Sequence, residues 1–160
     1  MKKKSTPRRW QKNPFAMHIA LNNVSLVKDA GEANTNMRII AHDAMDMLRQ
    51  GVATRGHMQM IVEAANMAET LASVEGIGKD WIPEINQAQE AIHAIANRSA
   101  EIGRYVLRAQ ELTALNLLME IHDAQLDACS IQTLGRAVDY IRKRMAANDY
   151  ISLPVIKEAA

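Results

Sequence analysis

An acidic residue and a histidine three positions apart, Glu90 and His93, form the E-x-x-H pattern with which some helical bundles bind metal ions. Di-iron sites of this kind use two such pairs and two further carboxylates. The sequence has no matching second pair, because Glu120 and His122 are two positions apart and point about 200° away from each other on a helix. These four residues are the metal candidates, but we expect no metal and no other cofactor.

His122 lies in the most apolar stretch of the chain, which makes it the candidate for catalysis. If the ring faces the interior, its nitrogens need hydrogen-bond partners. The nearest nucleophile, Cys129, follows about two helical turns later, and ~10 Å of rise is too far for direct proton exchange. We therefore interpret His122 as a hydrogen-bonded core histidine, name no catalytic residue and predict that the protein is not an enzyme.

A basic N-terminal arm is the most distinctive charge feature, because six cations lie within residues 2–12 and the first acidic residue is Asp29. Such cations can neutralise phosphates, and Trp10 can stack on an exposed base. Basic side chains near the C-terminal end would extend this phosphate-binding surface, and we call them the basic track. The predicted nucleic-acid-binding residues are Lys2, Lys3, Lys4, Arg8, Arg9, Trp10, Lys12, Arg136, Arg142, Lys143 and Arg144. Two alternatives are open: the arm serves only solubility, or it binds an acidic protein surface.

The net charge of +1 hides a separation of charge along the chain. Without the six cations of the arm, thirteen Lys and Arg face eighteen Asp and Glu, which is a balance of −5. The sequence therefore describes an acidic body, residues 14–160, preceded by a basic arm, residues 1–13, that we expect to be disordered when free.

The composition predicts one all-α domain. The 160 residues suffice for one core, and the apolar content comes mainly from Ala, Met, Leu and Ile, which suit closely packed helices. A single cysteine excludes an internal disulfide and is compatible with a reducing cytoplasm. No secretory signal is recognisable, and no apolar run approaches the ~18 residues of a membrane span, so we expect no membrane association.

Hydrophobic periodicity predicts a bundle of about five helices. Gly51 is placed to end the first, Thr54 and Ser130 are placed to cap the second and fifth, and Asp80 is placed to cap the third, with Pro83 in its first turn. The predicted helices cover 29–50, about 54–75, 80–102, 110–128 and from 130 onward.

The fourth predicted helix, 110–128, is apolar over much of its circumference, so we expect it at the centre of the bundle. The apolar tail after Asn148 is expected to dock on the body or on a partner. Three methionines, Met45, Met60 and Met67, fall outside the buried stripes of their helices. They predict a second apolar face, suited to a homo-oligomer or to a partner protein.

Three segments resemble short helical proteins encoded by bacteriophages and by prophages of proteobacteria: PRRWQKNPFA, TRGHMQMIVEAANMAETL and GRYVLRAQELTALNLLMEIHDAQLDAC. The resemblance covers most of the chain, but its motifs are packing patterns, so it transfers no site residue. It implies a phage context and a location in the cytoplasm of a bacterial host.

Three functions follow as expectations. The first is a non-enzymatic phage-type accessory protein that binds a macromolecule, with nucleic acid favoured through the basic arm. The second is an interaction protein that binds a host or phage protein, as in host takeover or anti-defence. The third is a helical-bundle metal enzyme built on Glu90, His93, Glu120 and His122.

Overall fold

The computed structural model describes residues 30–149, 153, 154 and 156. All regular secondary structure within these residues is helical, which confirms the predicted all-α bundle. A short 3-10 turn, η1 (Lys79–Trp81), precedes the third helix. The five α-helices of this part are α2 (Ala30–Arg49), α3 (Arg55–Ser73), α4 (Ile82–Ile102), α5 (Ala109–Ala128) and α6 (Ile131–Ala146). None of them is long and apolar enough to cross a membrane.

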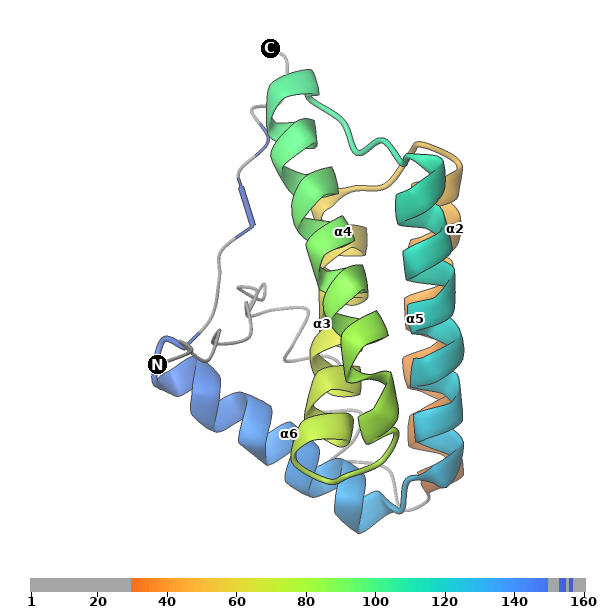
Figure 1. Cartoon of the computed structure of the whole chain (residues 1–160), viewed down its shortest axis with the longest axis vertical. Helices are drawn as coiled ribbons and strands as arrows, with labels where there is room; N and C mark the ends of the chain where they lie inside the picture. The colour runs from red at the N-terminus through yellow and green to blue at the C-terminus, as the bar shows by residue number, and fades with distance from the viewer. Residues whose placement is uncertain (1–29, 150–152, 155, 157–160) are drawn as a thin grey trace.

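Helices α2 to α5 run alternately up and down and pack as a four-helix bundle (Figure 1). Each packs against the next in the chain, and α5 returns to contact α2, which closes the ring. Helix α6 lies obliquely across the end of the bundle where α5 ends (Figure 1), and it packs mainly against α3. The loop 74–81 lies at that same end and joins α3 to α4.

Local capping interactions set most of the helix boundaries. The Thr54 hydroxyl accepts a hydrogen bond from the backbone N–H of His57, and the His57 ring accepts one from the N–H of Thr54. The Ser130 hydroxyl caps α6 by accepting a hydrogen bond from the backbone N–H of Thr133, and Gly51 has φ +72°, the left-handed conformation expected after a helix. The prediction that Asp80 caps a helix was wrong: Asp80 lies inside η1, and α4 begins after Trp81.

The central helix is α3, so the prediction that residues 110–128 occupy the centre was wrong. Thirteen of the nineteen α3 residues are buried, against eight of twenty in α5. The four alanines of α3 are all buried, which lets the other helices approach closely. Among its buried polar residues, Glu69 accepts a hydrogen bond at Oε2 from Gln89 Nε2, 3.1 Å away, and the Thr70 hydroxyl donates to the carbonyl of Asn66. These buried polar residues lower the hydrophobicity of the α3 sequence, so its composition did not indicate a central position.

The core consists of two adjoining clusters of buried side chains. The larger lies within the bundle and includes Met45 and Ile61, and the smaller joins α3 to α6 and includes Met67. Met60 is half-buried and packs on the larger cluster. The prediction that these methionines form an open face for a partner was therefore wrong, because α2 and α3 each bury a wider arc than the periodicity indicated.

The apolar tail docks on the body where it is described. Leu153 is buried in the larger cluster, and Ile156 packs against that cluster. The remaining apolar tail residues, the arm at 1–13 and the apolar segment at 14–27 lie outside the described residues.

One buried ion pair fixes the connection between α4 and α5. Arg98 donates to both carboxylate oxygens of Glu111, with Nη1–Oε1 at 2.8 Å and Nη2–Oε2 at 2.5 Å. The same carboxylate accepts the backbone N–H of Arg108, and Arg98 also donates to the carbonyl of Val106. These contacts lower the pKa of Glu111 against the opposing effect of its burial.

Candidate functional site

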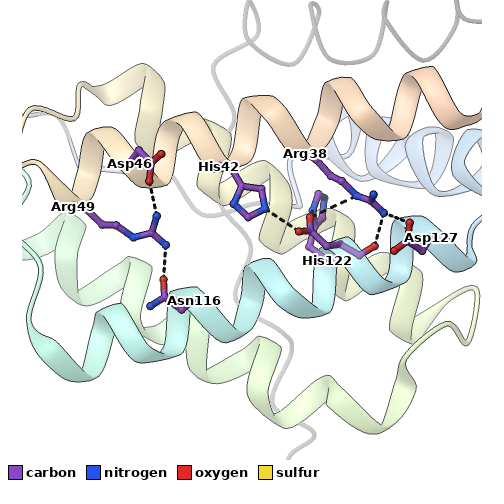
Figure 2. Close-up of polar contacts among 8 residues, drawn as sticks. Arg38, His42, Asp46, Arg49, Asn116, His122 and Asp127 are labelled. Atoms are coloured by element: carbon purple, nitrogen blue, oxygen red, sulfur yellow. Dashed lines mark hydrogen bonds and ion pairs between the residues drawn. The ribbon is translucent and has the colours of Figure 1, made fainter.

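A row of polar side chains joins α2 to α5 (Figure 2). We call it the polar seam; its residues are Arg38, His42, Asp46 and Arg49 of α2, and Asn116, His122, Asp123 and Asp127 of α5. Apart from His122, the members recur at three-, four- or seven-residue spacing on both helices, so each set lies on the side of its helix that faces the other. At one end of the seam, Arg49 bridges Asp46, at 2.5 Å, and Asn116, at 2.6 Å.

At the other end of the polar seam, Asp123 contacts two side chains of α2. His42 Nε2 lies 2.8 Å from Asp123 Oδ2, and Arg38 Nε lies 3.8 Å from Asp123 Oδ1. Arg38 also forms an ion pair with Asp127 and donates to the backbone carbonyl of Asp123. Interaction with His122, opposed by partial burial and reinforced by His42, lowers the pKa of Asp123 to about 2.

The His122 ring is buried, with 1% of the residue exposed, and neither ring nitrogen has a hydrogen-bond partner among the described residues. Its nearest polar contact is Asp123 Oδ1, 3.8 Å from Nδ1, which is longer than a hydrogen bond. The prediction of a hydrogen-bonded core histidine was therefore right about burial and wrong about the partners. The adjacent Asp123 instead forms its hydrogen bond with His42 of α2.

Acidification is expected to destabilise the fold through Asp123. The folded pKa of about 2 lies below the ordinary value of 3.8, so the stabilisation is present above about pH 4 and is lost as the pH falls through about 2. The free energy of unfolding of the wild type should approach that of Asp123→Asn over this range, measured by urea denaturation. A difference between the two proteins that stays constant from pH 5 to pH 2 would show that the seam does not depend on this charge.

The contacts of the seam indicate a structural role. A histidine held by a carboxylate is the usual base of a hydrolytic triad, but such a triad needs a hydroxyl or thiol on the other side of the ring. The hydrogen bond of His42 is made to a carboxylate, and the remaining seam contacts are ion pairs or bonds to an amide and a backbone carbonyl. The seam can thus fix α2 against α5, and its described contacts supply no nucleophile.

The metal candidates are not brought together. Glu90 and Glu120 are exposed, His93 contacts Asn97 on its own helix, and His122 is buried. Within the described part of the chain, no three His, Cys, Asp or Glu side chains lie close enough to hold one ion. The donor geometry that a bundle metal site needs is therefore missing from this part.

The predicted basic track on α6 is largely paired with carboxylates. Arg136 contacts both carboxylate oxygens of Glu75, and Arg142 contacts Asp139 at 3.5 Å. Arg144 contacts Asp149 and lies over the ring of Tyr140, 5.7 Å from its centroid. Among the described residues, Lys143 is the one α6 cation of the predicted set without a carboxylate partner. The seven predicted residues of the arm lie outside the described residues.

A half-open groove of about 300 Å³ lies between α5 and the loop 74–81. We call it the α5 groove. One wall is a stripe along α5, and the other comes from the loop and η1, where Trp81 is 48% exposed. The lining is mostly apolar, and it consists of Ile77, Gly78, Trp81, Leu117, Glu120, Ile121, Ala124, Gln125 and Ala128.

Gln125 and Gly78 build the floor of the groove. Gln125 Nε2 donates to the carbonyls of Ala68, at 3.0 Å, and Ile77, at 2.8 Å, and so ties the loop to both α3 and α5. Gly78 has φ +75°, and a side chain there would stand 3.3 Å from Gln125, so both its conformation and its close approach require glycine. The amide oxygen of Gln125 is buried and has no donor within the described residues.

The sequence contained one signal for this groove, the apolar circumference of α5, which predicted a central helix and not a binding surface. Helix α5 is apolar over most of its circumference, and a central position was the expected explanation. In the structure, one side of α5 packs in the bundle, and the outer side presents Leu117, Ala124 and Ala128 to the groove. No family model, no curated protein and no solved structure matches the chain.

Proposed function

We propose that the chain is a non-enzymatic binding protein that holds a segment of a partner protein in the α5 groove. One observation carries the proposal: none of the described residues covers the apolar α5 groove, and Trp81 on its wall is almost half exposed. Burying apolar surface is the main driving force of protein association, and exposed apolar grooves are typical of binding sites.

The shape of the groove favours a polypeptide. Its α5 wall runs from Leu117 to Ala128, about 16 Å at 1.5 Å per residue. That length matches three turns of a docked helix or an extended segment of about five residues at 3.3 Å each. The resemblance to phage-encoded proteins would make the partner a host or phage protein.

A blocking substitution tests the proposal. Ala124 is exposed on the α5 wall, so Ala124→Trp should fill the groove without disturbing the core. Random twelve-residue peptides selected on the wild type should bind Ala124→Trp at least about tenfold more weakly, a loss of about 1.4 kcal/mol. The matched control is Ala94→Trp at an exposed position of α4 outside the groove, which should bind like the wild type.

Two results would contradict the proposal. One is a selection that enriches no peptide on the wild type, and the other is a set of peptides that bind Ala124→Trp and Ala94→Trp equally well. Thermal unfolding of both variants should match the wild type, which excludes loss of the fold as the cause.

Nucleic-acid binding through the basic arm is a second candidate, favoured by the separation of charge. The described residues 30–149 carry eleven Lys and Arg against sixteen Asp and Glu, so the cations that could neutralise phosphates are concentrated in the arm. The ion pairs of α6 indicate that α6 contributes little. The full chain should bind DNA or RNA with strong salt dependence in fluorescence anisotropy, and deletion of residues 1–12 should abolish this binding. No binding by the full chain at low salt would eliminate this candidate.

A further inference from the structure

We infer that the segment held in the α5 groove presents a lysine or arginine side chain beside an apolar one. This inference rests on the proposed function and adds the chemistry of the occupant. The carboxylate and the aromatic side chain that line the groove favour a positively charged ligand, and the buried amide oxygen of Gln125 behind the lining adds partial negative charge.

Glu120 supplies the carboxylate of the groove. Helix α5 carries four acidic residues, and the other three have cationic or basic partners: Glu111 pairs with Arg98, Asp127 pairs with Arg38, and Asp123 contacts both Arg38 and His42. Glu120 is exposed and has no ion pair among the described residues. Its charge is thus available to a cation entering the groove.

Trp81 supplies an aromatic side chain on the opposite wall, with 48% of the residue exposed. A lysine or arginine head group over a tryptophan ring is attracted by the negative face of the ring, and tryptophan is the strongest partner for this interaction. The apolar stem of such a side chain can lie along the apolar lining while its charged head reaches the rim. The groove therefore suits a residue that combines an apolar stem with a charged head.

Gln125 makes the floor electronegative. Its Nε2 is held by two backbone carbonyls, so reversing the amide would place an oxygen against both of them and is disfavoured. The Oε1 atom therefore keeps its position without a donor among the described residues, and its partial negative charge is not compensated locally. The overall balance of −5 on residues 30–149 has the same sign.

The test compares cationic peptides with their neutral analogues. Peptides selected on the wild type should be enriched in Lys or Arg next to an apolar residue, and replacing that cation by Gln should weaken binding on the order of tenfold. Glu120→Gln should cause a similar loss for the cationic peptide and little loss for the Gln analogue. Glu101→Gln, at an exposed position of α4 outside the groove, should leave binding unchanged.

Binding is measured in the Trp10→Phe background, where Trp81 is the remaining tryptophan and its fluorescence reports occupancy of the groove. Selected peptides that lack cations, or that bind the wild type and Glu120→Gln equally, would overturn the inference while leaving the proposed function standing. A selection that yields no groove-binding peptide would overturn both.

Discussion

Replacing Ile61 with alanine is expected to lower the free energy of unfolding by about 3 kcal/mol, since buried Ile-to-Ala changes remove apolar contacts and leave a cavity. Ile61 is fully buried on α3, the helix that contacts every other helix of the described bundle. Because α3 packs against four other helices, the side chains around this position cannot all move inward to fill the space. Urea denaturation followed by circular dichroism at 222 nm measures the change.

Ile39→Ala is the matched control for this prediction. Ile39 lies on α2 with 60% of the residue exposed, so the same substitution should change the free energy of unfolding by no more than about 0.5 kcal/mol. Equal effects at the two positions would contradict the assignment of α3 as the central helix. If shortening a buried side chain of α5, for example in Leu115→Ala, lowers the free energy of unfolding more than Ile61→Ala does, α3 is not the helix on which stability depends most.

Replacing Glu111 with glutamine is expected to cost about 2 kcal/mol, because removing one partner of a largely buried ion pair leaves the other charge poorly compensated. Arg98 would keep its bond to the carbonyl of Val106 and lose both charge-assisted bonds to the carboxylate. Urea denaturation measures this loss, and Glu101→Gln on the exposed side of α4 serves as the control, with a change within about 0.5 kcal/mol.

A double substitution separates the charge from the packing. Arg98→Met with Glu111→Leu removes both charges, so it should be less destabilising than the sum of the two single substitutions. Additive effects would contradict a direct coupling between the two side chains. Additive effects would instead indicate that this region is stabilised by the hydrogen bond from the backbone N–H of Arg108 to the Glu111 carboxylate.

The features that the sequence predicted correctly depend on neighbouring residues. Thr54 and Ser130 cap helices through bonds to residues three positions away, and Gly51 ends α2 through its own backbone conformation. Such signals lie within one turn and can be recognised without knowing the tertiary fold. The helix boundaries that the sequence predicted therefore agree with the structure to within about two residues, and at the start of α4 the 3-10 turn η1 replaces the predicted first helical turn.

The features that were missed depend on contacts between distant segments. Arg38 meets Asp123 and Asp127, more than eighty residues away, and no local pattern indicates that α2 and α5 lie side by side. The centre of the bundle was assigned to α5 because apolar composition predicts burial but does not show which helix has the most neighbours. Helix α3 takes that place: its four alanines are all buried, whereas none of the four in α5 is, and buried small side chains allow close approach.

The groove was missed for a related reason. Continuous apolarity around α5 is compatible with two arrangements: a helix buried on all sides, or a helix buried on one side with a binding surface on the other. The position of Trp81 distinguishes them, and that position depends on the turn at Gly78 and on the bonds of Gln125 across the floor. Neither is encoded in a local motif.

The most direct measurement of the central claim, that the α5 groove is a binding site, is chemical-shift mapping of ¹⁵N-labelled protein with a selected peptide. We predict that the largest shifts fall on residues 77–81 and 117–128, and that Ala124→Trp abolishes them while Ala94→Trp does not. Largest shifts on α2, α4 or α6, with residues 117–128 unaffected, would contradict the claim and place the binding surface elsewhere.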